Sequence, residues 1–222
     1  MNQSDVRPLP LILMGAGGHA KVLLSLARAC GYDVVGVCDP GLVRQGISHW
    51  RGIAVLGADD VLDQYAPSDI ELINGIGQVV GGNLRRVVHE SASAKGFRFP
   101  PLVHPAAWLD DTVVLEEGVQ VMAGAILQAD VRIGCASIVN TSASIDHDSR
   151  VAAHVHVAPG VTLCGGVTVA EGAFIGSGST VIQGVVIGED ALVGAGTVVV
   201  RDVPARGVLI GPSARTRSVP DS

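Results

Sequence analysis

The stretch "VTVAEGAFIGSGSTVIQGVVIGEDALVGAGTVVV", residues 167 to 200, repeats one arrangement of side chains every six residues. From Val169 onward, each sixth residue is Ile or Val. Stepping backward in sixes extends the series to Leu109 without an insertion, and every member is Leu, Ile or Val. The fifth position of each hexad, from Val113 to Val203, is restricted to Val, Ala, Ser or Thr. Neither a helical period of 3.6 nor a strand period of 2 explains this spacing.

A period of six predicts a short strand followed by a turn, with one large aliphatic side chain pointing inward on each side. Three sides close a coil of eighteen residues, and successive coils stack about 4.8 Å apart with their strands paired. Residues 109–204 comprise 96 residues, and 96/18 gives a little over five coils. Each inward aliphatic stabilises the fold by roughly 1.5–3 kcal/mol. We therefore predict a three-sided β-solenoid with a rigid register.

The first hundred residues predict a different architecture, in which strands alternate with helices. "LPLILMGAGGHAKVLLSLARACGYDVVGVCDP", residues 9–40, reads as strand, glycine turn, amphipathic helix and second strand. The helix should bury Val22, Leu23, Leu26 and Ala27. Further elements are expected as a strand within 51–57, a helix over 58–65, a strand over 71–77, a helix over 83–93 and a strand near 97–103. This alternation predicts a small parallel sheet, and the prolines of "FPPLVHP" divide the chain into domains 1–104 and 105–222.

The glycine turn after the first strand, residues 15–20, satisfies the pattern G-x-G-x-x-[GA]. Its glycines let backbone N–H groups approach a phosphate at the start of a helix, where the dipole favours an anion. Asp39, after the second strand, would accept a hydrogen bond from a ribose or a base. An NAD-dependent oxidoreductase is therefore one interpretation, although about 105 residues leave only half of a doubly wound fold. A glycine turn that serves packing alone is another.

The overall composition and charge argue against several classes of protein. A formal charge of −6 disfavours a nucleic-acid surface, which requires a basic face. No apolar run approaches the roughly 20 residues that span a bilayer, and the N-terminal segment does not read as a cleaved signal. The four cysteines form no CxxC pair, which suits free thiols in the cytoplasm.

The stretch "SASIDHDSRVAAHVHVAPG", residues 142–160, adds three histidines and two aspartates to the solenoid. His147 falls on an outward turn position, and one coil later, at 147 + 18, comes Gly165. A bare backbone beside an imidazole leaves space for a narrow ligand and an N–H for an oxyanion, which suits acyl transfer. His156 lies nine residues on, half a coil away, so the two histidines can act together only if a second subunit packs alongside.

Other interpretations of these side chains are weaker. Three histidines and two carboxylates suggest a zinc site as an alternative. However, H-x₆-H-x-H is not a usual ligand spacing, and we expect no metal. His154 is as well explained by surface or packing roles as by chemistry. Cys164, beside Gly165, would suggest an acyl-enzyme nucleophile, yet it has no activating base evident in the sequence.

The hexads resemble those of the hexapeptide-repeat acyltransferases, whose solenoid is a left-handed parallel β-helix. "GAGGHAK", "CDP", "GIGQ" and "LVHPAA", in that order before the hexads, resemble nucleotide-sugar acetyltransferases of the sialic-acid O-acetyltransferase and bacillosamine-pathway N-acetyltransferase type. The resemblance implies an α/β N-terminal domain that binds a nucleotide-activated sugar, a β-helix that binds acetyl-coenzyme A (acetyl-CoA), and a homotrimer with active sites between subunits.

The resemblance also assigns residues. His147 would be the catalytic base and Asp148 the adjacent carboxylate. Around the nucleotide sugar it implies Gly15, Gly17, Gly18, His19 and Lys21 at the diphosphate, Asp39 and Pro40 by the base, Gly77 and Gln78 near the nucleotide, and Asn140 at the substrate. For acetyl-CoA it implies His156, Gly165, Gly176, Ser177, Gly194 and Ala195, with Arg215 or Arg217 at the coenzyme phosphates.

The expected reaction is direct transfer of acetyl to the amino group, at C4, of a nucleotide-linked amino-dideoxy sugar. O-acetylation of a sugar hydroxyl is the nearest alternative, and a non-catalytic scaffold that binds sugar nucleotides is a third. Whether the base is uracil, guanine or thymine stays open.

Overall fold

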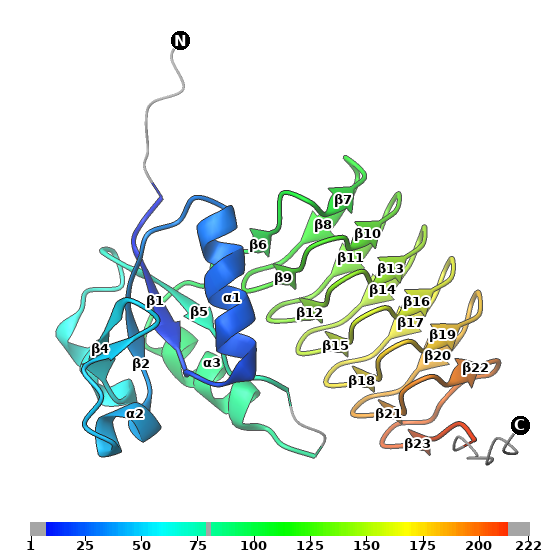
Figure 1. Cartoon of the computed structure of the whole chain (residues 1–222). Coiled ribbons are helices and arrows are strands. Elements are labelled where there is room, and N and C mark those ends of the chain that lie inside the picture. Colours follow the sequence, from blue (N-terminus) through cyan, green and yellow to red (C-terminus); the bar gives the residue numbers. More distant parts are fainter. Residues whose placement is uncertain (1–7, 79–80, 213–222) are drawn as a thin grey trace, which may run out of the picture.

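The computed structural model describes residues 8–78 and 81–212. It consists of an N-terminal α/β domain and a long three-sided solenoid that lies beside it (Figure 1). Among the described residues, no helix is long and apolar enough to cross a membrane.

The N-terminal domain is built on a five-stranded sheet in the order β3-β4-β2-β1-β5. Its strands are β1 (Leu11–Met14), β2 (Val34–Cys38), β3 (His49–Trp50), β4 (Ile53–Gly57) and β5 (Glu71–Asn74). Four of these strands are parallel, but β3 is antiparallel to β4. The predicted parallel sheet is thus present in four strands, and β3 extends it as an antiparallel edge strand where Arg51 and Gly52, both with positive φ, turn the chain back on itself.

Helices cover both faces of this sheet. They are α1 (Gly18–Ala29), α2 (Pro40–Arg44), the 3₁₀ helix η1 (Asp59–Gln64) and α3 (Leu84–Ala94). The predicted buried face of α1 is correct for Leu23, Leu26 and Ala27 but wrong for Val22, which is exposed. The buried stripe instead includes Ala20 and Leu24. It is centred on Ala20, Leu23 and Ala27, and Val22, one residue before Leu23, lies about 100° around the helix from it.

The solenoid confirms the six-residue period. Its strands are two residues long, and in the main series the second residue of each strand points into a continuous aliphatic core. Strands eighteen residues apart pair in parallel, as in Ile126↔Ser144 and Leu127↔Ile145. The result is three parallel sheets that form a left-handed β-helix, as the resemblance to hexapeptide-repeat acyltransferases implies.

We number the three sides of the solenoid by their sheets. The first side comprises β7 (Trp108–Leu109), β10 (Ile126–Leu127), β13 (Ser144–Ile145), β16 (Thr162–Leu163), β19 (Thr180–Val181) and β22 (Val198–Val199). The second side comprises β8 (Val114–Leu115), β11 (Arg132–Ile133), β14 (Arg150–Val151), β17 (Thr168–Val169) and β20 (Val186–Ile187). The third side comprises β6 (Leu102–Val103), β9 (Gln120–Val121), β12 (Ile138–Val139), β15 (His156–Val157), β18 (Phe174–Ile175), β21 (Leu192–Val193) and β23 (Val208–Leu209).

The N-terminal domain packs on the third side. Outward residues of this side, such as Leu102 and Ile138, belong to the same buried cluster as Leu23 of α1 and Leu13 of β1. The strand expected near 97–103 is confined to β6, and it pairs with β9 of the solenoid and not with the small sheet. Pairing of the solenoid thus starts just before residue 105, while the division into domains at that residue stays a prediction.

Candidate active site

His147 lies on the turn that joins β13 to β14, at the corner between the first and second sides. Its side chain is 62% exposed and its Nδ1 lies 2.8 Å from Oδ2 of Asp148. The hydrogen bond to Asp148, and then the charge of Asp146, raise the pKa of His147 above its ordinary value. Because the carboxylate can only accept, Nδ1 carries the proton and Nε2 of the neutral ring is the free base.

Gly165 is the neighbour of His147 one coil further along. A Cβ atom at Gly165 would lie 2.6 Å from His147 Nε2, so only glycine leaves this nitrogen its room. No acceptor among the described residues takes the Gly165 N–H. The expected arrangement, in which an imidazole lies beside a glycine without a side chain and an available backbone N–H, is therefore present at this corner.

The glycine turn ends where α1 begins. Gly17 is the N-cap of α1 and provides no side-chain cap. A Cβ atom at Gly17 or Gly18 would meet nothing within 4 Å, so packing within this chain does not require glycine at either position. Open space before uncapped N–H groups favours a phosphate site over a turn that serves packing alone. Lys21 extends from the exposed face of the same helix.

The remaining nucleotide-site candidates have roles within the fold. Asp39 caps α2 by accepting from the N–H of Leu42 at 2.9 Å, and its second oxygen accepts from the N–H of Ala16 at 2.9 Å. Pro40 is the first residue of α2. Gly77 lies near the Cβ atom of His19, and Gln78 donates weakly to the carbonyl of Gly172 in the solenoid, at 3.4 Å. Asp39 thus holds the glycine turn against α2.

His156 is the outward residue of β15, on the third side beneath the N-terminal domain, and it is buried. The N–H of Thr141 donates to Asn140 Oδ1 at 2.8 Å and fixes the orientation of the amide, so Asn140 Nδ2 faces His156 Nε2 at 3.2 Å. An amide nitrogen can only donate, so Nε2 of His156 accepts. Burial lowers the pKa of His156 to about 3, so its ring is neutral. The proton then sits on Nδ1, a buried donor without a partner among the described residues.

His19 lies in the first turn of α1 and contacts the solenoid. Its Nε2 is 2.7 Å from Oε1 of Gln120, the outward residue of β9. Burial, together with the charge of Arg85, lowers the pKa of His19 to about 4. An uncharged ring at neutral pH does not favour the predicted contact with a diphosphate.

The predicted coenzyme residues fall on two corners. Gly165 accompanies His147, whereas Gly176, Ser177, Gly194 and Ala195 lie on turns between the third and first sides. Asn140 begins another turn of that same corner. Within one chain, the two groups are separated by the width of the first side. Arg215 and Arg217 lie outside the described residues.

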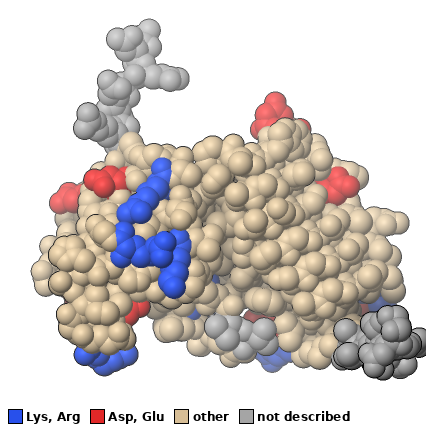
Figure 2. Space-filling view, in the orientation of Figure 1, with Lys and Arg blue, Asp and Glu red and all other residues tan. Residues whose placement is uncertain are grey.

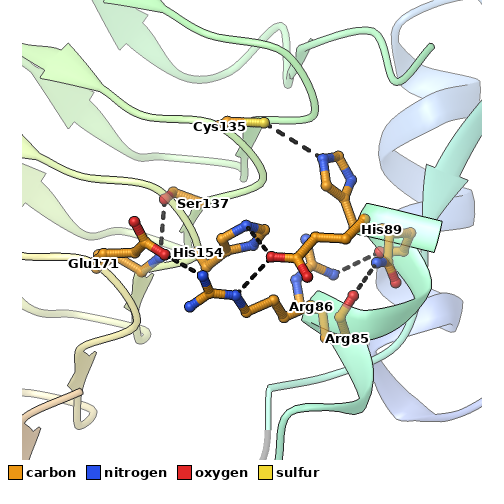
Figure 3. Close-up of polar contacts among 10 residues, drawn as sticks. Arg85, Arg86, His89, Cys135, Ser137, His154 and Glu171 are labelled. Carbon is orange, nitrogen blue, oxygen red and sulfur yellow. Dashed lines mark hydrogen bonds and ion pairs between the residues drawn. The ribbon is translucent and has the colours of Figure 1, made fainter. Parts of the chain in front are cut away.

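A polar network that the sequence analysis did not anticipate joins α3 to the corner between the second and third sides (Figure 3). Buried Arg85 donates to the carbonyls of Asn74 and Ile76, at 2.7 and 2.8 Å, and to that of Ala136 at 3.3 Å. Arg86 pairs with Glu171, and His89 Nε2 lies 3.4 Å from Cys135 Sγ. One signal was available, since Arg85 shares the buried stripe of α3 with Val88 and Ala92.

Within residues 8–78 and 81–212, no group of three His, Cys, Asp or Glu side chains has a geometry that could hold a metal ion. His154 instead faces α3, where its Nε2 lies 3.8 Å from Glu90 and its ring packs edge-on against His89. Its environment is that of a packing histidine.

Two family models match the chain. Residues 10–92 match the PglD N-terminal domain, and residues 166–201 match the bacterial transferase hexapeptide repeat. PerB from Caulobacter crescentus, solved with CoA and GDP-perosamine, is 40% identical, with 91% of this chain and 94% of that chain covered and a TM-score of 0.83. The chain belongs to the PglD-type hexapeptide-repeat acetyltransferases.

Other PglD-type structures agree. The acetyltransferase domain of PglB from Neisseria gonorrhoeae, in complex with acetyl-CoA, is 33% identical, with 92% of this chain and 97% of that chain covered and a TM-score of 0.84. A histidine-to-asparagine variant of the C. crescentus perosamine N-acetyltransferase, in complex with CoA and GDP-perosamine, is 39% identical over 95% of this chain and 97% of that chain, with a TM-score of 0.83. Membership in this family favours acetyl transfer over the oxidoreductase and scaffold interpretations.

Proposed function

We propose that this protein, an acetyl-CoA-dependent N-acetyltransferase of nucleotide amino sugars, acetylates the C4 amino group of a GDP-linked 4-amino-4,6-dideoxyhexose with His147 as general base. The observation that carries the proposal is the corner formed by His147, Asp148 and Gly165. The covered length and identity of the perosamine N-acetyltransferase support GDP-perosamine as the first substrate to test.

The corner supplies the groups that acetyl transfer needs. As the amine nitrogen bonds to the thioester carbon, His147 Nε2 accepts the proton that the nitrogen loses. Asp148 holds the ring by Nδ1 and stabilises the imidazolium. The C–S bond then breaks, and the same proton leaves with the thiol of CoA. The free N–H of Gly165 is a candidate donor to the carbonyl oxygen as negative charge develops.

The N-terminal domain would hold the nucleotide sugar. The open glycines Gly17 and Gly18 and the uncapped start of α1 are suited to the diphosphate, with Lys21 nearby. Asp39 fixes this turn and would lie by the base. On the third side, Asn140 fixes the tautomer of His156, which the resemblance assigns to acetyl-CoA although its Nδ1–H is closed off from solvent within one chain.

We infer that a second copy completes each active site. His147 lies at one end of the first side, whereas His156, Asn140 and the predicted coenzyme glycines lie on the third side and at the other end of the first. Three copies with their first sides toward a common axis would bring the His147 corner of each against the opposite corner of the next. This arrangement is the homotrimer that the resemblance implies.

The outward residues of the first side suit burial between copies. They are Trp108, Ile126, Ser144, Thr162, Thr180 and Val198, and none is charged. The second side, in contrast, carries Arg132 and Arg150 side by side. Depletion of charge is typical of the centre of a protein interface.

The deciding experiment measures release of CoA thiol with acetyl-CoA and a panel of GDP-, UDP- and dTDP-linked 4-amino sugars, each beside its 4-hydroxy counterpart. We expect turnover with a GDP-linked amine and none with the hydroxyl sugars. His147→Asn should lower kcat by about 10²–10⁴-fold with little change in GDP binding. No turnover with any amine, or a near-normal rate in His147→Asn, would contradict the proposal.

A further inference from the structure

Gln120 is a buried amide between the two domains, and its two ends have different partners. Its Nε2 donates to the carbonyl of Asn74 at 3.0 Å, and its Oε1 lies 2.7 Å from His19 Nε2. It is 3% exposed and is the outward residue of β9. The amide thus bridges the end of β5 and the first turn of α1.

The orientation of this amide follows from its partners. A backbone carbonyl can only accept, so the nitrogen of Gln120 must face Asn74 and the oxygen must face His19. Asn74 is held in turn by its own contacts with Arg85, whose Nη1 donates to the Asn74 carbonyl at 2.7 Å. Because Oε1 also can only accept, the proton of His19 must sit on Nε2.

The other nitrogen of His19 is left as an acceptor. Burial keeps the ring neutral at physiological pH, with a pKa of about 4. Nδ1 has no hydrogen-bond partner among the described residues, and His19 is only partly buried. His19 also directly follows Gly17 and Gly18, the open glycines of the turn.

A neutral acceptor at this position selects the group it can bind. A phosphate oxygen and the lone pair of Nδ1 would repel each other, whereas an O–H or N–H of a sugar beyond the diphosphate would donate to Nδ1. We propose that Gln120 is a positioning residue that presents Nδ1 of His19 as the hydrogen-bond acceptor for an O–H or N–H of the sugar. The identity of the ligand as a sugar rests on the proposed function. The claim that Gln120 fixes the tautomer of His19 does not.

The tautomer can be tested without turnover. In the full chain with ¹⁵N-labelled histidine, a long-range ¹H–¹⁵N NMR spectrum identifies which ring nitrogen is protonated, and His19→Asn assigns the signal. At pH 7 we expect protonated Nε2 and unprotonated Nδ1 in the wild type, and a mixture of tautomers in Gln120→Leu. A protonated Nδ1 in the wild type, or an unchanged spectrum in Gln120→Leu, would overturn the role of Gln120.

The acceptor can be tested with two matched substitutions. His19→Asn places a carbonyl near the position of Nδ1, whereas His19→Gln places an N–H near the position of Nε2 and leaves no acceptor at Nδ1. We expect the KM for GDP-perosamine to rise roughly tenfold in His19→Gln, the cost of about one hydrogen bond, and less than threefold in His19→Asn. The Kd for GDP alone, measured by calorimetry, should stay within about twofold in both.

The outcomes separate the proposals. An equal rise in KM in both variants, or a weakened Kd for GDP, would show that His19 packs or contacts the diphosphate and would overturn the acceptor role. If the wild type acetylates no amino sugar, the proposed function fails, and with it the acceptor role toward a sugar. The NMR result still decides whether Gln120 sets the tautomer of His19.

Discussion

At the scale of single residues, the role of His147 as a base depends on two neighbours, Asp148 and Gly165. Asp148 supplies the carboxylate that holds Nδ1, and Gly165 supplies the absence of a side chain next to Nε2. Both positions are local to one corner, so each can be altered while the rest of the coil is retained.

Gly165→Ala should lower kcat by about 10²-fold without unfolding the chain. The backbone of Gly165 is not in the left-handed region, so alanine is tolerated there, but its methyl group would displace the imidazole. Displacement of a catalytic group by about 1 Å can cost a factor of this size. Cys164→Ala is the matched control and should keep near-normal kcat; a large loss there would instead support a covalent acyl-enzyme.

Asp148→Asn should move the rising limb of the pH–kcat profile to lower pH. The base acts in its unprotonated form, so kcat rises as pH passes through the pKa of His147. The hydrogen bond to Asp148 is the largest cause that raises this pKa, and Asp146 contributes next. Without the carboxylate the pKa falls toward that of an ordinary histidine, and the plateau of kcat should fall by about tenfold or more. A profile whose midpoint is unchanged would argue against the pair.

At the scale of elements, the glycine turn, α1 and α2 form one unit because Asp39 joins them. One carboxylate oxygen caps α2 and the other holds the N–H of Ala16 inside the turn. The same carboxylate therefore serves both folding and the geometry of the phosphate site.

Asp39→Ala should lower the free energy of unfolding by about 2 kcal/mol, since loss of a helix cap alone costs about 1 kcal/mol and a second backbone donor loses its acceptor. Asp39→Asn, which keeps one acceptor oxygen, should lose about half as much. Urea titration measures both. Asp33→Ala, which removes an exposed carboxylate without side-chain hydrogen bonds among the described residues, should change stability by less than about 0.5 kcal/mol.

Elements with a strict period were the most predictable from the sequence. The hexads define the solenoid because each inward Leu, Ile or Val recurs at a fixed step, and β1 and β2 follow from short apolar runs bounded by turns. The expected helix over 58–65 is instead the 3₁₀ helix η1, and β6 joined the solenoid. Residues 59–64 and 102–103 are too short for propensity to outweigh packing.

The candidate site could be predicted from the sequence only for residues whose contact is set by the eighteen-residue coil. His147 and Gly165 are related by eighteen residues, so their contact follows from the period. The contacts of His19 with Gln120 and of Arg85 with Ala136 span 101 and 51 residues. They depend on how the N-terminal domain docks on the third side, which no local pattern encodes.

At the scale of the whole molecule, the N-terminal domain occupies the third side and leaves the first and second sides uncovered within one chain. In the space-filling view, charged side chains are sparse on the visible face of the solenoid, while several Lys and Arg side chains gather over the N-terminal domain (Figure 2). An uncharged first side beside a charged second side makes the proposed assembly testable face by face.

Thr162→Arg should convert the proposed trimer to a monomer and abolish turnover. Thr162 is exposed at the middle of the first side, and burying unpaired charges around a common axis costs more than the contacts return. Val186→Arg on the second side, also exposed, should leave assembly intact. Light scattering distinguishes a chain of 22.7 kDa from three times that mass. If the Thr162→Arg variant were still a trimer, the first side would not be the interface.

The eighteen-residue pairing of the solenoid also limits how its length can change. An insertion of six residues would move every later residue of the solenoid to the next side. If the insertion preceded the turns that contact α3, those turns would no longer face this helix. A whole coil added beyond Val181 would instead lengthen the solenoid by about 4.8 Å and leave His147, Gly165 and the docked domain undisturbed. The solenoid is thus modular in units of one complete coil, and we expect variants with a longer solenoid to be obtained by duplication of that unit.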